Sequence, residues 1–361
     1  MQELLTNLTR LSHEFGVERY VLGGGGNTSV KDGDLLWVKP SGGTLRDMTA
    51  ERFVCLDRRA IEGLFAADMP TESRAREAAV KEWMGRTVVS GSEGRPSVEA
   101  PLHSILPGRY VVHTHPVLVN GLTCGVRGEE ACTKLFPEAM WVGYVDPGYT
   151  LCAHVRKALA QFCGAHGRAP TLVFLENHGL FVSADTPEEI RALYATVMRA
   201  LEQVYAQAGV ATALCVGIPP EGAGERMRRA WRNALGEEEG GGVMVAVSGI
   251  FPVFRGPLTP DHVVYAGAFA CRGGVERGSL RAFRAAHGYY PRVVDGGDAV
   301  FGVGATTAAA TLALAFARDA AMVEQLAAAF GGARYMDDRA RKFIENWEVE
   351  QYRRQVTTGS V

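Results

Sequence analysis

The chain has 361 residues, of which 47% are hydrophobic and 22% charged, and its formal net charge is −2. This composition is ordinary for a globular protein, and the balanced charge argues against a nucleic-acid or acidic-membrane partner. No apolar run approaches the ~18 residues of a membrane span, the N-terminus lacks the pattern of a signal peptide, and the seven cysteines include no Cys-x-x-Cys pair, so we expect a cytoplasmic protein with reduced thiols.

Helical and strand-like patterns alternate through the first 207 residues. Apolar residues at helical spacing predict a helix over 2–16 that stops at Gly16. Asp32-Gly33 predicts a hairpin turn between two strands. The other expected elements are strands at 20–22, 27–30, 35–38, 110–112 and 171–175 and helices at 74–83, 151–163 and 187–207. Because short turns join several of these strands, we expect an α/β domain with antiparallel pairing.

A change in composition divides the chain. Proline and glycine concentrate at 215–224, and acids and glycines at 237–242. We therefore expect one domain over 1–213 and a C-terminal α/β extension over 214–361. In the extension we expect strands at 243–247 and 293–294, an Ala-rich helix at 306–330 and a charged, aromatic helix at 337–354.

Two histidine motifs follow predicted strands. His113 and His115 come directly after the strand 110–112, and residues two apart on a strand point to the same face. His178 follows the strand 171–175, and Glu99 lies upstream of both motifs. Each motif alone is weak, since histidines are common in cores and turns. Together they predict three imidazoles around an open coordination position, as in catalytic zinc sites, with a carboxylate as general base.

Glycine and polar residues precede this site. Four consecutive glycines at 23–26 lead into Asn27, and such a loop can present backbone N–H groups to an anion. With Lys39, Ser41 and Ser97 it suits a phosphate or a polyhydroxylated, carboxylated fragment, and a flexible hairpin tip is the alternative. These glycines do not form a dinucleotide-binding loop, because no Gly-x-Gly-x-x-Gly opens a helix here. The segment 302–304 before the Ala-rich helix is a partial match that lacks the third glycine, which argues against a dinucleotide site there.

Five segments resemble a known family. They are Gly-Asn-Thr-Ser at 26–29, Lys-Pro-Ser-Gly at 39–42, 96–103 with its Glu and His, His-Thr-His at 113–115, and Glu-Asn-His-Gly-Leu at 176–180. In this order they resemble the class II aldolase/adducin superfamily, and the resemblance covers about residues 1–210. It implies an αβα sandwich around a mixed, largely antiparallel central sheet. It also implies a homo-oligomer, most often a cyclic tetramer, with one Zn²⁺ per chain near a subunit interface.

The resemblance also assigns roles to residues. It implies that His113, His115 and His178 hold zinc, although another divalent metal remains open. It implies that Glu99 ligates the metal before substrate enters and then transfers a proton. The candidates for the phosphate or distal end of the substrate are Asn27, Lys39, Ser41, Gly42 and Ser97.

Some positions depart from the family pattern or stay open. Val98 and Lys39 stand where small-sugar-phosphate aldolases have Ser and Thr, and the loss of a hydroxyl donor weakens the case for a phosphate. His103 lies four residues after Glu99. It either orients the Glu99 carboxylate without binding the metal itself or packs as a histidine in a helix. The tyrosine that donates a proton to the leaving aldehyde remains open among Tyr144, Tyr149 and Tyr352.

The resemblance implies a lyase of carbohydrate metabolism. The expected reaction is zinc-dependent aldol cleavage or formation of a C–C bond in a ketose phosphate or related hydroxyketone, through a metal-stabilised enediolate. Decarboxylation of a 3-oxo acid phosphate and 4-epimerisation of a pentulose phosphate fit the same site. An adducin-like assembly module is the non-enzymatic alternative, and the complete set of three histidines and Glu99 argues against it.

The C-terminal part has a narrower resemblance. Segments 257–263, 291–294 and 347–350 resemble those after the aldolase part of the predicted bifunctional rhamnulose-phosphate aldolase/alcohol dehydrogenases. In that group a short-chain dehydrogenase domain comes next, and this sequence reaches Val361 without one. We expect residues 214–361 to serve assembly or to cover the substrate pocket.

Overall fold

The structure, a computed structural model, describes residues 1–235 and 242–347. The chain forms two compact units. Unit 1 contains Met1–Val119 and Gly128–Leu201, and unit 2 contains Asn120–Arg127 and the chain from Glu202 onward. The division into domains at 213/214 stays a prediction.

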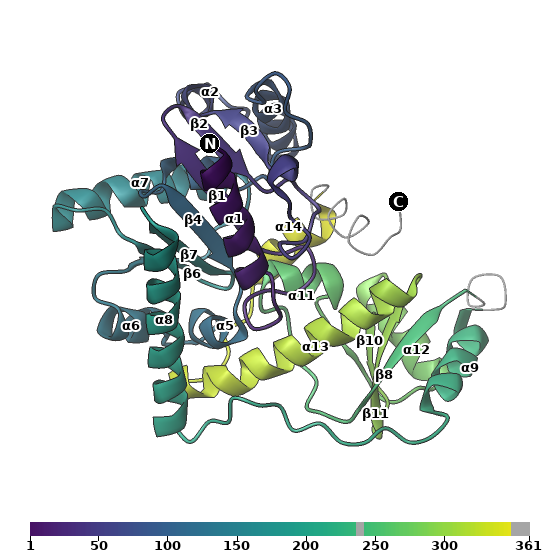
Figure 1. The fold of residues 1–361 in the computed structure, drawn as a ribbon. Helices are drawn as coiled ribbons and strands as arrows, with labels where there is room; N and C mark the ends of the chain where they lie inside the picture. The colour runs from purple at the N-terminus through teal and green to yellow at the C-terminus, as the bar shows by residue number, and fades with distance from the viewer. Residues whose placement is uncertain (236–241, 348–361) are drawn as a thin grey trace. The chain divides into compact units, whose positions relative to one another are not determined.

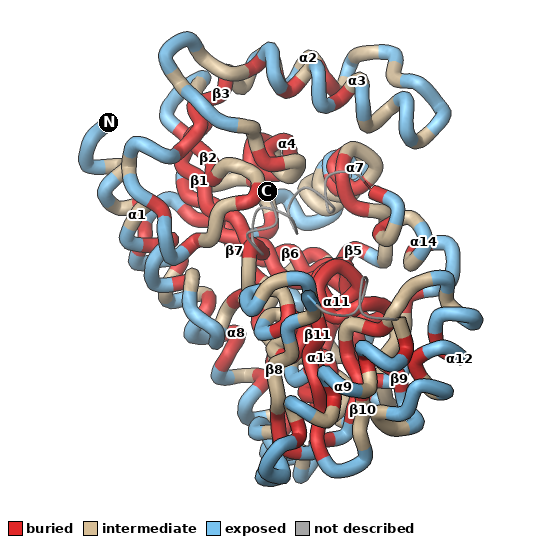
Figure 2. Tube along the Cα trace, turned by 90° about the vertical axis from the view of Figure 1, so that its right-hand side faces the viewer, coloured by how far each residue is buried: buried red, intermediate tan, exposed pale blue. Residues whose placement is uncertain are grey.

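The sheet of unit 1 is mixed and largely antiparallel, as expected. Its order is β3-β2-β1-β4-β7-β6-β5, and only β5 and β6 pair in parallel. Strands β4, β6 and β7 are buried at every position (Figure 2). The strand bounds are β1 Asn27–Asp32, β2 Leu35–Val38, β3 Val54–Asp57, β4 Tyr110–Thr114, β5 Met140–Val142, β6 Leu172–Leu175 and β7 Gly179–Ala184.

Helices cover both faces of this sheet, which confirms the αβα sandwich (Figure 1). On one face Phe15 of α1 packs against Tyr194 of α8, whose hydroxyl donates to the Val112 carbonyl of β4. On the other face α4 and α7 pack against Val111 and Phe181. The helices of this part are α1 Gln2–Phe15, η1 Ala50–Arg52, α2 Arg58–Leu64, α3 Ser73–Arg86, α4 Ala100–Ile105, α5 Val117–Thr123, α6 Gly128–Leu135, α7 Tyr149–His166 and α8 Pro187–Gln207.

Unit 2 has a four-stranded sheet in the order β8-β11-β10-β9. Helices α9 and α12 share an apolar core with one face of this sheet, and α13 packs against β11 and β8. A Cβ at Gly302 of β11 would lie 2.2 Å from the Ala310 carbonyl oxygen of α13, so close helix–sheet packing accounts for this glycine. The elements are α9 Ala223–Leu235, β8 Met244–Gly249, α11 Pro260–Tyr265, β9 Cys271–Arg272, α12 Arg277–His287, β10 Val293–Asp295, β11 Ala299–Gly304, α13 Thr307–Ala327, η2 Ala328–Phe330 and α14 Asp338–Asn346.

Several local predictions differ from the structure. Residues 20–22 are not a strand, because the Tyr20 carbonyl accepts a single hydrogen bond from the His115 N–H and no ladder forms. The C-terminal helix ends at Asn346, and the rest of the segment expected to be helical, from residue 348, lies outside the described residues. Within the described ranges, no helix has the length and apolar character needed to cross a membrane.

Candidate metal centre

The end of strand β4 delivers the first two histidines. His113 is the penultimate residue of β4, is fully buried, and pairs with Asn27 of β1 on one side and Phe181 of β7 on the other. His115 follows the strand. Gly26 approaches this strand end so closely that a Cβ there would lie 2.9 Å from the His113 carbonyl oxygen, and its φ is +70°. Only glycine fits both conditions, so the glycine segment packs against the strand and is not an exposed hairpin tip.

The surroundings of His113 set its tautomer. Its Nδ1–H donates to the Leu180 carbonyl oxygen at 3.0 Å, and its ring stacks on Phe181 with centroids 3.9 Å apart. Because Nδ1 carries the proton in this hydrogen bond, Nε2 keeps its lone pair for a cation or an acid. A carbonyl that accepts from the second ring nitrogen is the usual support of a metal-binding histidine.

The turn between β6 and β7 supplies the third histidine. Asn177 adopts a left-handed conformation with φ of +53°, and the His178 N–H donates to the Leu175 carbonyl at 3.2 Å. Gly179 follows, where a Cβ would lie 2.6 Å from the Thr114 carbonyl oxygen. The tight turn and the small residue after it bring His178 close to the end of β4.

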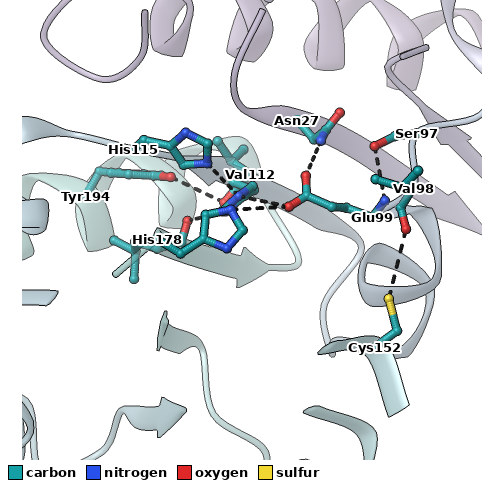
Figure 3. Close-up of polar contacts among 11 residues, drawn as sticks. Asn27, Ser97, Val98, Glu99, Val112, His115, Cys152, His178 and Tyr194 are labelled. Carbon is teal, nitrogen blue, oxygen red and sulfur yellow. Dashed lines mark hydrogen bonds and ion pairs between the residues drawn. The ribbon is translucent and has the colours of Figure 1, made fainter. Parts of the chain in front are cut away.

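The three imidazoles converge, and Figure 3 shows the rings of His115 and His178 near the Glu99 carboxylate. One nitrogen from each of His113, His115 and His178 lies within 4.8 Å of the other two. His115 Nε2 is 2.9 Å from His113 Nε2, and two lone pairs at this separation repel unless a proton or a cation lies between them. A three-imidazole donor set with room for a fourth ligand fits a catalytic divalent metal such as zinc.

Glu99 faces these nitrogens. Its Oε1 lies 3.3 Å from His113 Nε2 and 3.6 Å from His178 Nε2, and its Oε2 accepts a hydrogen bond from Asn27 Nδ2. Burial raises the pKa of the Glu99 carboxyl, but the nearby His113, His178 and His115 outweigh burial and hold it well below its usual range. The carboxylate is therefore ionised and its position is fixed by Asn27.

His103 lies behind Glu99 but does not contact its carboxylate. Its Nδ1 is 2.8 Å from Ser29 Oγ, and only its backbone N–H bonds to Glu99, at the carbonyl oxygen. Burial lowers the pKa of His103 to about 3, so the ring is neutral. Of the two alternatives for His103, this contact with Ser29 of β1 is the one expected of a histidine packed in the helix, and the orienting role stays a prediction.

The expected substrate loop lies beside the segment that carries Glu99. The Ser41 N–H donates to the Arg95 carbonyl at 2.9 Å, and Ser97 Oγ accepts from the Glu99 N–H at 3.2 Å. Lys39 is buried, and its ammonium donates to the Gly43 carbonyl at 2.5 Å. Gly42 has a φ of +88°, which shapes the turn.

The tyrosine candidates lie in different settings. Tyr149 begins α7 and its ring stacks on Phe65 at 6.4 Å. The Tyr144 N–H donates to Glu176 Oε2 at 2.8 Å, so Glu176 fixes this loop. Tyr352 lies outside the described residues.

Three supports of the site were not predicted from the sequence. They are the Leu180 carbonyl, the ring of Phe181 and the hydroxyl of Tyr194, which lies 2.7 Å from Oγ1 of Thr114, the residue between His113 and His115. The two-residue period of strand β7 could have indicated Phe181, because it stands two residues after Gly179 and its side chain is therefore on the same face of the strand. Nothing local marks Tyr194, which reaches β4 from α8.

Comparison with known proteins bears on the same part of the chain. The model of the Class II Aldolase and Adducin N-terminal domain matches residues 6–205. The uncharacterized oxidoreductase YuxG of Bacillus subtilis (strain 168) is 30% identical over 204 residues, which are 53% of this chain and 28% of that protein. The chain thus spans less than a third of this relative's length.

Solved structures also align with this part. The N-terminal class II aldolase domain of a conserved protein from Thermoplasma acidophilum is 25% identical with a TM-score of 0.47, over 55% of this chain and 92% of that one. An L-fuculose-1-phosphate aldolase from Thermus thermophilus is 17% identical with a TM-score of 0.37, over 57% of this chain and 96% of that one.

Proposed function

Because the chain belongs to the class II aldolase and adducin family, we propose that it is a metal-dependent aldolase acting on a ketose phosphate or related hydroxyketone. The observation that carries the proposal is the convergence of three imidazole nitrogens within 4.8 Å of one another, with the Glu99 carboxylate 3.3 Å from one of them. An assembly module has no need of a buried histidine cluster facing an ionised carboxylate. The proposal therefore places chemistry at this cluster.

In this proposal His113, His115 and His178 hold one zinc ion, and another divalent metal is the alternative. When bound, the cation supplies Lewis-acid stabilisation of negative charge that develops on substrate oxygens. The hydrogen bond from His113 to Leu180 supports this assignment, because it leaves Nε2 as the ligand atom.

Glu99 is the proposed proton carrier. Its Oε2 is held by Asn27, which leaves Oε1 on the side of the histidines to take a proton from the substrate carbon and return it. Burial of the site opposes charge on Glu99 and the imidazoles favour it, so entry of a substrate that displaces water changes this balance.

The distal end of the substrate is assigned to the loops of Lys39, Ser41, Gly42 and Ser97, with Asn27 at the boundary. The hydrogen bond between Ser41 and Arg95 supports this assignment because it holds the two loops together. Lys39 contributes a positive charge that suits a phosphate or a carboxylate. The resemblance of the sequence motifs to sugar-phosphate aldolases of the family is the basis for naming a sugar phosphate.

Product analysis tests this function directly. The protein is incubated with a panel of ketose 1-phosphates, pentulose 5-phosphates and 3-oxo acid phosphates, and released aldehyde, epimer or CO₂ is measured. We expect an aldehyde and a three-carbon ketone as products. Epimer or CO₂ as the main product would assign the same site to a pentulose-phosphate 4-epimerase or a decarboxylase, and no turnover of any substrate would favour an adducin-like module.

Glu99→Gln tests the proton carrier. We expect it to retain the metal and lower kcat by about 100- to 10,000-fold, the usual contribution of a general base. Glu176→Gln is the matched control, since its side-chain oxygen can still accept from the Tyr144 N–H. Equal kcat for Glu99→Gln and the native protein would remove Glu99 from the mechanism.

A homo-oligomer, with a tetramer favoured, is also proposed from the family. Light scattering on the full chain measures the subunit count. Residues 214–361 are proposed to serve assembly or to cover the pocket. A monomer with full activity would contradict both a subunit-interface site and an assembly role.

A further inference from the structure

A second pocket lies within unit 2, far along the chain from the histidine motifs. Strand β9, helix α12 and strand β10 lie together in unit 2 (Figure 2) and form a β–α–β unit. The two strands pair in parallel with Arg272 opposite Asp295. Both residues are the last of their strands. In open α/β sheets, ligands bind outside the carboxyl ends of parallel strands. A pocket of ≈ 490 Å³ lies at these two residues, a size typical of small-molecule sites.

Arg272 is held in place by two hydrogen bonds and keeps further N–H donors for a ligand. Its Nη2 donates to the carbonyl oxygens of Val253 and Phe254, each at 2.6 Å, which fixes the plane of the guanidinium. Within residues 1–235 and 242–347, its Nε and Nη1 make no hydrogen bond or ion pair. A planar guanidinium with free N–H groups is suited to a carboxylate.

Arg255 and Glu324, the other charged residues of the pocket, bind each other. Glu324 Oε1 accepts from the Arg255 N–H at 2.6 Å and from Tyr335 at 2.8 Å, and Oε2 lies 3.3 Å from Arg255 Nε. This carboxylate therefore has no need of a ligand. Arg272 and Asp295 are then the charged groups of the pocket that can bind a ligand.

Asp295 offers the complementary acceptor. Its Oδ1 accepts from the Gly297 N–H at 3.0 Å, and among the described parts of the chain its Oδ2 has no partner. Neighbouring strands are ~4.8 Å apart, so Arg272 and Asp295 reach groups on adjacent atoms of a small molecule. Besides the charged residues, the wall consists of one amide, Gln325, and of the apolar residues Leu214, Pro252, Val253 and Ala321.

We propose that this pocket binds a small carboxylate with a hydroxyl or ammonium group on the neighbouring carbon, that is, a 2-hydroxy or 2-amino acid. The carboxylate pairs with the free Nη1 N–H groups of Arg272, and the hydroxyl or ammonium donates to Asp295. The two side chains have opposite charges, so the preferred ligand carries an anionic group and a donor together. The site is independent of the three-histidine cluster and of the reaction proposed there.

Calorimetric titration of the full-length protein tests the proposal. The probes are glycerate, lactate and serine, and propionate serves as the comparison ligand without a donor. We expect saturable binding of at least one probe and at least tenfold weaker binding of propionate. Arg272→Gln and Asp295→Asn should each weaken binding of that probe about tenfold or more, which is about 1.4 kcal/mol.

Three controls separate the outcomes. Arg277→Gln removes an exposed arginine of α12 that does not line the pocket and should leave the affinity unchanged. Asp295→Asn keeps an oxygen acceptor for Gly297, so it remains informative if Arg272→Gln fails to fold. Glu99→Gln should bind the probe as the native protein does. The proposal is overturned if no probe binds, if both pocket variants bind normally, or if Glu99→Gln abolishes binding.

Discussion

Substitution of Gly179 by alanine tests how closely the two strands that carry the histidines approach. An alanine Cβ would lie 2.6 Å from the Thr114 carbonyl oxygen and 2.7 Å from His115 Cδ2. The second distance is about 0.8 Å below the ~3.5 Å of an ordinary carbon–carbon contact. The strand ends must therefore separate, at a cost of about 1–3 kcal/mol for an overpacked site.

The displacement falls on a predicted metal ligand. Metal–ligand distances tolerate only ~0.2 Å, so moving His115 by several times that amount should weaken zinc binding about 10- to 100-fold. Gly143→Ala is the matched control, because a Cβ there meets only Glu176 Oε2 at 3.6 Å. Chelator competition gives the zinc affinity, and urea unfolding gives the stability.

The result that would refute this reasoning is specific. Gly179→Ala with the zinc affinity and stability of Gly143→Ala would mean that His115 and the β6–β7 turn do not hold one cation between them. Loss of stability with unchanged zinc affinity would place the contact in the core and remove His115 from the ligand set.

Three further predictions concern other parts of the molecule. Burial and, to a smaller extent, the neighbouring Arg58 lower the pKa of Lys31 from 10.5 to about 7. Between these two values the unfolded chain binds more protons than the native protein, so the free energy of unfolding rises with pH. The stability advantage of Lys31→Met over the native protein, measured by urea unfolding, should therefore shrink by about 2 kcal/mol from pH 7 to pH 9. An unchanged advantage would contradict the burial of a titrating amine. Asn27→Ala removes the donor to Glu99 and should lower kcat about tenfold with zinc content unchanged, whereas a rise in KM alone would place Asn27 at the substrate. Asp319→Ala leaves buried His262 Nε2 without its partner at 2.9 Å and should cost about 1–3 kcal/mol in calorimetric unfolding, and an unaltered melting temperature would exclude this pair as a support of unit 2.

Local sequence patterns predicted the parts of the site that depend on one strand or one turn. The spacing of His113 and His115 on β4 follows from the two-residue period of a strand, and the Asn-His-Gly turn follows from residues that tolerate a left-handed backbone. The antiparallel pairing of β1 with β2 also follows from the short turn at Asp32-Gly33.

Contacts between distant segments were beyond local patterns. Ser29, on the neighbouring strand, takes the ring of His103 away from the Glu99 carboxylate, and no spacing along the chain encodes that choice. Helix α9 was not predicted, because its buried Met227 and Trp231 lie among arginines that make the segment look solvated. The parallel pairing of β9 and β10 depends on an intervening helix that was also not predicted.

Metal content per chain tests the central claim most directly. Elemental analysis of the purified native protein, with His113→Ala and His178→Ala prepared in parallel, measures the metal and the need for each imidazole. We predict about one zinc or other divalent ion per chain in the native protein and little in either variant. Full aldolase activity in a metal-free preparation, or unchanged metal content in both variants, would contradict a cation held by these three histidines.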